Sequence, residues 1–362
     1  MQQSSFWHQL NKPTVGLSPM DGVSDHPFRV ITKKYGNPDV IFTEFVSVEG
    51  LCHSAAVLLD HFIYNEQQRP VVAQIFGKTP EFFRQAAILV SQLGFDGIDI
   101  NMGCPARTVT NHGSGAGLIQ TPELAQQIVR AVQKGVQDYQ SGQTVADCAD
   151  FSPEIRSIVE LRSKQLPKQY QNCQRNIPIS IKTRLGYSDS IITEWLEVLF
   201  QTNPELITVH GRTLKQGYGG QANWEDIGQA ANIAKKYATA SGKKRTLIFG
   251  NGDVQSRAQA EILANKHNLD GVLIGRASFG NPFVFLADEE TDQPKLARIA
   301  LEHAQVFEKT FAHRSNYNFL PMRKHLGWYI RSLPKAKEIR LELVKTNSAA
   351  EVEKVLTQYQ LI

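Results

Sequence analysis

The sequence predicts an α/β fold, a parallel (β/α)8 TIM barrel followed by a small C-terminal all-helical domain. Eight short β-rich apolar runs recur over roughly 280 residues, and a helical pattern follows each of them. Polar and glycine residues gather directly after all eight runs. A doubly wound sheet would show fewer units and a glycine-rich turn after its first strand, which this chain lacks. We therefore expect a barrel over 1–290 and helices over 291–362.

Composition is that of an ordinary soluble globular protein, with 41% hydrophobic and 20% charged residues in a chain of 362. The apolar runs are too short to cross a bilayer, and residues 1–10 lack the apolar centre of a secretory signal. The four cysteines are scattered, without a C-x-x-C pair. This spacing argues against a zinc site and a disulfide framework, so we expect a cytoplasmic protein without a bound metal.

The elements follow from apolar runs and helix-start signals. Two helices are expected over 81–93 and 123–134, each after a Thr-Pro pair in which Thr can cap and Pro can take the first helical position. Two further helices with apolar faces are expected over 296–311 and 322–330. The expected strands cover residues 14–17, 39–44, 70–76, 97–100, 178–183, 206–209, 246–249 and 271–274.

The fourth strand is followed by Asn101-Met102-Gly103-Cys104-Pro105, which holds a thiol between a glycine that lets the chain turn and a proline that fixes the turn. Because TIM barrels keep their chemistry at the carboxyl ends of the strands, this thiol is placed to give or take a proton. A free cysteine is also among the most buried residue types, so core packing is the alternative interpretation.

The ends of strands seven and eight carry Gly250-Asn251-Gly252-Asp253 and Gly275-Arg276. Barrels of this kind commonly bind a phosphate at that position. Glycine lets backbone N–H groups approach the phosphate oxygens, and Arg276 can add a bidentate contact. Tight turns would explain either segment alone but not both in register.

Three further side chains are expected at the same mouth. The ammonium of Lys182, after strand five, can stabilise negative charge that develops on a reduced ring. His210, after strand six, can bind a phosphate, polarise a carbonyl or serve the structure alone. Gln74 can both donate and accept hydrogen bonds, which suits the edge of a heterocycle with imide groups.

The C-terminal third is basic. Residues 293–346 hold eleven Lys and Arg against four acidic residues, although the whole chain carries only +4. Such a segment favours a polyanionic partner, with a solvated helical surface as the alternative.

Taken together, these motifs resemble the tRNA-dihydrouridine synthases, flavoenzymes that reduce uridine in tRNA. The resemblance covers most of the chain. The matching segments lie at 19–25 with Phe28 and Arg29, and at 101–105, 115–118, 182–186, 209–213, 250–253, 274–277 and 323–329.

The resemblance implies an FMN-binding barrel and a helical domain that helps to hold tRNA. Cys104 would be the proton donor. The residues expected to contact the RNA are Asn101, Arg184, Arg323 and Lys324. Those expected to contact FMN are Pro19, Met20, Asp21, Gln74, Lys182, His210, Asn251, Gly252, Asp253, Gly275 and Arg276.

The implied reaction reduces the C5=C6 bond of uracil. Reduced FMN would deliver a hydride to C6, while a thiol with an ordinary pKa of roughly 8.5 is still protonated at neutral pH and can supply the proton at C5. NADPH, or NADH, would first reduce the flavin in the same mouth. The target base would be pulled out of the folded tRNA, and nothing requires more than a monomer.

One stretch departs from the family pattern. Residues of about 135–176, between strands four and five, are long and polar where the family has one helix and a short turn. We interpret the stretch as a surface insertion and expect it near the mouth, where it would contribute to tRNA binding.

Two other functions remain open at this stage. The first is an FMN barrel acting on a small substrate, as in the dihydroorotate and dihydropyrimidine dehydrogenases, although these lack a basic helical domain. The second is an RNA-binding protein with a vestigial flavin site, against which the intact Cys104, Lys182 and Arg276 argue.

Overall fold

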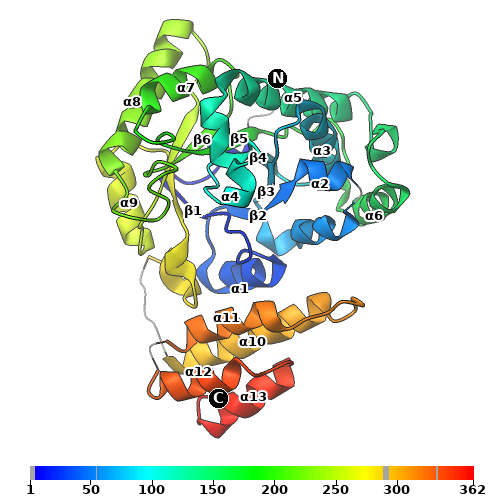
Figure 1. The fold of residues 1–362 in the computed structure, drawn as a ribbon, viewed down its shortest axis with the longest axis vertical. Coiled ribbons are helices and arrows are strands. Elements are labelled where there is room, and N and C mark those ends of the chain that lie inside the picture. The colour runs from blue at the N-terminus through cyan, green and yellow to red at the C-terminus, as the bar shows by residue number, and fades with distance from the viewer. Residues whose placement is uncertain (1–4, 54, 288–292, 332) are drawn as a thin grey trace.

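A computed structural model of the chain describes residues 5–53, 55–287, 293–331 and 333–362. Eight parallel strands close into a barrel in chain order (Figure 1). All eight expected strands are confirmed, and the first and last have the expected bounds. The strands are β1 (Thr14–Leu17), β2 (Ile41–Ser47), β3 (Val71–Phe76), β4 (Gly97–Met102), β5 (Ile179–Arg184), β6 (Leu206–His210), β7 (Leu247–Asn251) and β8 (Gly271–Ile274).

Helices connect the strands and surround the barrel (Figure 1). Pro80 and Pro122 occupy first-turn positions as expected, but neither preceding threonine caps its helix through its side chain. The backbone N–H of Thr79 instead donates to Glu49, at 3.1 Å. The connecting helices are α1 (His26–Gly36), α2 (Val48–Cys52), α3 (Pro80–Gln92), α4 (Arg107–Thr110), α5 (Pro122–Gln140), α6 (Pro153–Lys164), α7 (Ile192–Phe200), α8 (Trp224–Ser241) and α9 (Arg257–Lys266).

The amino-terminal end of the barrel is closed by aromatic packing. Trp7, in the short 3-10 helix η1 (Phe6–His8), lies with its ring 6.1 Å from that of Phe42 and 5.6 Å from that of Phe249. All three are buried in one apolar cluster with inward-facing side chains of other strands. Since this end is filled, any ligand must enter at the carboxyl ends of the strands.

A second apolar core lies in the C-terminal helices, which Figure 1 shows beside α1. It includes Ile31 and Phe283 from the barrel, so the two parts share buried surface. The expected boundary at 290–291 lies outside the described residues. No helix in the described part of the chain is long and apolar enough to cross a membrane. The C-terminal helices are α10 (Gln293–Phe311), α11 (Leu320–Tyr329), α12 (Ala336–Leu343) and α13 (Ala349–Gln358).

Two neighbouring aromatic residues of α11 differ in their relation to this core. Tyr329 is buried there. Trp328 is only half-buried and stacks on Phe279 of the barrel, with ring centroids 4.2 Å apart and planes 13° apart. Trp328 therefore joins the helical part to the loop after β8.

We expect Gly280→Ala to destabilise the protein by roughly 2–3 kcal/mol. Gly280 has a φ of +69°, and a Cβ there would lie 2.3 Å from the carbonyl carbon of Trp328. Gly242→Ala is the matched control, because Gly242 has a φ of +67° but no atom within 4 Å of its Cβ position. Thermal unfolding of both variants would measure the difference. Equal losses would show that the backbone conformation, not the contact with α11, matters.

Candidate active site

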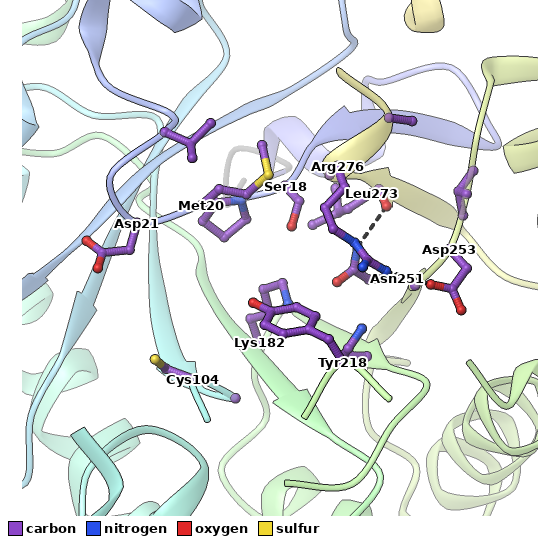
Figure 2. Close-up of a pocket in the computed structure, with 18 of the residues that line it drawn as sticks. Ser18, Met20, Asp21, Cys104, Lys182, Tyr218, Asn251, Asp253, Leu273 and Arg276 are labelled. Carbon is purple, nitrogen blue, oxygen red and sulfur yellow. Dashed lines mark hydrogen bonds and ion pairs between the residues drawn. The ribbon is translucent and has the colours of Figure 1, made fainter. Parts of the chain in front are cut away.

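A cavity of about 1220 Å³ opens at the carboxyl ends of the strands. Each of the eight strands, or the loop that follows it, contributes lining residues, and Arg331 of the helical part also lines the cavity. Figure 2 shows Asp21 and Cys104 on one side, Arg276 and Asp253 on the other, and Lys182 between them. The cavity is therefore a single space with a thiol on one side and a cationic corner on the other.

The structure brings all eleven expected cofactor contacts to this cavity, and their individual roles stay predictions. Cys104, Asn101 and Arg184 also line it. The eleven are Pro19, Met20, Asp21, Gln74, Lys182, His210, Asn251, Gly252, Asp253, Gly275 and Arg276.

Cys104 is held by its own loop. The Oδ1 atom of Asn101 accepts hydrogen bonds from the backbone N–H groups of Gly103 (3.1 Å) and Cys104 (2.8 Å). Burial raises the pKa of the Cys104 thiol above its usual value, and the carboxylate of Asp21 adds to the rise. The group is thus a protonated thiol at neutral pH and suits the role of acid rather than nucleophile.

The side of the cavity formed by β5 and β6 is rich in positive charge. Burial and, to a smaller extent, the neighbouring Arg184 lower the pKa of Lys182 to about 8. Burial and the surrounding cations drive the pKa of His210 far below its usual value. At neutral pH His210 is therefore uncharged and can act only through hydrogen bonds, whereas Lys182 still carries its proton.

The corner at β7 and β8 is built around Asp253. Its two carboxylate oxygens accept from Arg276 at 2.8 Å and from Arg212 at 2.6 Å, and the N–H of Ala222 adds a bond of 2.9 Å. The arginines and the backbone bond hold the pKa of Asp253 below its usual value. This carboxylate holds Arg276 in place, so we expect it to support an anion site rather than to touch the anion.

Two glycines expose backbone at the same corner. Gly252 has a φ of +134°, and a Cβ there would lie 2.7 Å from the Cβ of Ala222. At Gly275 a Cβ would project to within 3.4 Å of the Met20 sulfur. Because a side chain at either place would fill the space beside Arg276, these residues fit the phosphate of a nucleotide such as FMN.

Arg184 links two loops of the mouth. Its Nε donates to the carbonyl of Gly103 at 2.7 Å, while one Nη donates to those of Thr213 and Gly217, each at 3.0 Å. The loop next to Cys104 and the loop after β6 are thereby fixed to each other. Contact between Arg184 and RNA stays a prediction.

Two residues that line the cavity, Tyr218 and Arg331, and one that lies beneath the lining, Arg212, were not predicted from the sequence as parts of the site. Tyr218 is 64% exposed, and its ring centroid lies 5.3 Å from the Arg276 guanidinium. Arg331 belongs to the basic segment that favours a polyanionic partner, but the sequence did not place it in the lining of the cavity. Arg212 is 1% exposed and pairs with Asp253 beneath the lining. A tyrosine in a glycine-rich loop and a charged residue inside a motif gave no reason to choose them.

Arg323 and Lys324, expected as RNA contacts, lie outside the cavity lining. Arg323 donates to the carbonyl of Thr346 and to the side chain of Asn347, at 3.0 and 2.8 Å. The ammonium of Lys324 donates to the carbonyl of Gly22, in the loop after β1. Both side chains thus make structural contacts, and a role in tRNA binding stays a prediction.

The polar stretch of 135–176 is not at the cavity, since none of its described residues lines it. Its helix α6 packs against α3 and the short helix η2 (Ala56–Phe62). Arg162 donates to the carbonyl of Leu59 at 2.7 Å. Within the described residues, no group of three or more His, Cys, Asp and Glu side chains could hold a metal.

Comparison with known proteins shows the family to which the chain belongs. The sequence model of the dihydrouridine synthase (Dus) family matches residues 16–144 and 163–361. A probable tRNA-dihydrouridine synthase of Staphylococcus aureus (strain COL) is 31% identical over 363 residues, covering 99% of this chain and 96% of the relative. The probable tRNA-dihydrouridine synthase 2 of Bacillus subtilis (strain 168) is 30% identical over 363 residues, covering 98% and 97%. The unmatched residues 145–162 fall inside the expected insertion.

Proposed function

Because the chain belongs to the dihydrouridine synthase family, we propose that it reduces uridine in tRNA to 5,6-dihydrouridine. The proposed cofactor is FMN, and NADPH or NADH is the reductant. One observation carries this proposal: a protonated thiol and a cationic, glycine-lined corner open onto the same cavity. We further propose that the protein is a monomer and acts in the cytoplasm.

FMN, when bound, supplies the hydride that adds to C6 of the uracil ring. The protein's part begins with binding: Arg276 and the backbone at Gly252 and Gly275 would hold the phosphate. The ammonium of Lys182 would lie in the middle of the cavity. There it would stabilise negative charge that develops on the ring system. Gln74 would hydrogen-bond the ring edge.

Cys104 completes the reaction on the substrate. Its S–H proton goes to C5 of uracil, so that the ring gains one hydride and one proton and the sulfur is left as a thiolate. The thiolate then takes a proton from solvent. Asn101 keeps the thiol in place through the backbone of Gly103 and Cys104. Proton transfer of this kind contributes roughly 10²–10⁴-fold to the rate.

The substrate must reach the cavity as a single extruded base, because the cavity is enclosed by the loops of the barrel. Tyr218 at the mouth offers a flat ring on which a base can stack, and Arg331 offers a positive charge for a backbone phosphate. Both belong to loops or helices at the entrance rather than to the strands.

The direct test is to incubate the purified protein with unmodified tRNA and NADPH and to measure dihydrouridine by nucleoside mass spectrometry. Formation of dihydrouridine that requires both NADPH and FMN would support the proposal. Orotate and free uracil should be offered in parallel. Reduction of a free pyrimidine without reduction of tRNA would instead support a small-substrate enzyme.

Flavin reduction should become slower as the pH rises through about 8. Lys182 is charged below its folded pKa of about 8 and loses its proton above it; its electrostatic contribution is therefore present at pH 7 and lost at high pH. Anaerobic stopped-flow measurement of flavin bleaching by NADPH, from pH 6.5 to 9.5, would show the decrease. Lys182→Met should be slow throughout and lack this step. An unchanged step in the variant would assign the titration to another group.

A further inference from the structure

A buried carboxylate below the cavity has no part in the reaction described so far. Asp99, on β4, is completely buried. The barrel register pairs it with Gln74 on β3 and with Ser180 on β5. These three side chains therefore stand side by side on neighbouring strands, one layer beneath the ligand.

Asp99 begins a chain of short hydrogen bonds. Its Oδ1 accepts from the hydroxyl of Ser180 and its Oδ2 from Nε2 of Gln74, both at 2.6 Å. The Oε1 of Gln74 accepts from Nδ2 of Asn101 at 2.9 Å. The Oδ1 of Asn101 then accepts hydrogen bonds from the backbone N–H groups of Gly103 and Cys104. The chain thus runs from a buried charge to the loop that carries the thiol.

The direction of this chain follows from the charge at its start. An ionised carboxylate can only accept, so Gln74 must turn its NH2 group to Asp99 and its oxygen to Asn101. Asn101 must then turn its NH2 group to Gln74, which leaves its oxygen for the backbone N–H groups. Among the described residues, each amide uses only one of its two N–H groups in these bonds.

Gln74 and Asn101 line the cavity, whereas Asp99 does not. We propose that Asp99 is a positioning residue that sets the polarity of the cavity floor: it directs an N–H of Gln74 toward FMN and, through Asn101, fixes the backbone that carries Cys104. The proposal rests on the proposed function, since it takes FMN as the ligand and Cys104 as the proton donor. A neutral residue at this place would leave both amides free to rotate.

Asp99→Asn should weaken FMN binding about tenfold, roughly the effect of losing one hydrogen bond from Gln74 to the ring. The effect should pass through Gln74. In a Gln74→Ala background, the same substitution should therefore change the FMN dissociation constant less than about twofold. Fluorescence titration of the apoprotein with FMN would give all four constants. The visible spectrum of the bound flavin should also shift in Asp99→Asn, because a purely structural role would leave the ring environment unchanged.

Asp96→Asn is the matched control. Asp96 is a partly buried carboxylate just before β4, bonded to the N–H of Val71 at 2.8 Å, and it is not among the cavity residues. Its substitution should leave FMN affinity unchanged even if stability falls. Burial raises the pKa of Asp99 to about 6, so a neutral residue there should be tolerated by the fold. Asp99→Leu, of similar size, is a second variant with the same expected loss.

Equal effects of Asp99→Asn in the presence and absence of Gln74 would overturn the proposal, as would an equal effect of Asp96→Asn. Measurements on the wild-type protein distinguish failure of the Asp99 proposal from failure of the proposed function. If the wild type neither binds FMN nor forms dihydrouridine, the proposed function fails and this inference fails with it. If the wild type does both, the four dissociation constants decide on Asp99 alone.

Discussion

Replacing Cys104 with alanine should reduce dihydrouridine formation by roughly 10²–10⁴-fold. In the proposed reaction the acid is the Cys104 thiol, which lines the cavity and which burial keeps protonated. Alanine has no proton to give. Reduction of bound flavin by NADPH should continue at nearly the wild-type rate, because hydride transfer to the flavin does not use this proton. Mass spectrometry of the tRNA and absorbance of the flavin would measure the two steps separately.

Cys173→Ala is the control for loss of a thiol as such, since Cys173 is also a free, half-buried cysteine but does not line the cavity. It should leave both steps unchanged. Equal product from wild type and Cys104→Ala would remove Cys104 from its role while keeping the enzyme. A parallel loss of flavin reduction would mean that the substitution disturbs the cavity as a whole.

The barrel and most of its mouth could be predicted from the sequence because each strand is a short apolar run that ends in polar or glycine residues. The strand end that differs most from its expected position is that of β2, expected at Glu44 but found at Ser47. Glu44 is charged and was taken as the strand end. It is buried instead, because His61 binds its carboxylate at 2.9 Å. The partner lies outside the strand, so no local pattern reveals it.

Two further contacts could not be predicted from the sequence because they depend on tertiary structure. Lys324 and Gly22 are 302 positions apart, and their contact joins the helical part to the loop after β1, which no local pattern of charge reveals. Asp99 was hidden for a different reason, since it lies inside an apolar run where only strand register shows that it faces Gln74 and Ser180. The role of a charged residue is therefore hard to predict from the sequence until its partners in the fold are known.

Arg276→Ala should weaken FMN binding by roughly 10–100-fold, because it removes a charge-assisted contact to the phosphate. The fold should be retained, since Arg276 is half-exposed and Asp253 keeps its bonds to Arg212 and Ala222. Fluorescence titration of the apoprotein with FMN would measure the loss. The same titration with riboflavin, which lacks the phosphate, should give nearly equal affinities for wild type and variant.

The comparison of FMN with riboflavin tests whether Arg276 contacts the phosphate in particular. Arg298→Ala removes the same charge from an exposed position on α10, away from the cavity lining, and should not change either affinity. If Arg276→Ala lost affinity for riboflavin and FMN alike, the guanidinium would act on the ring or on the loop around Tyr218, whose ring it faces. The phosphate would then have to be held by the backbone at Gly252 and Gly275 beside the uncharged His210. The corner at β7 and β8 would owe its selectivity to shape rather than to charge.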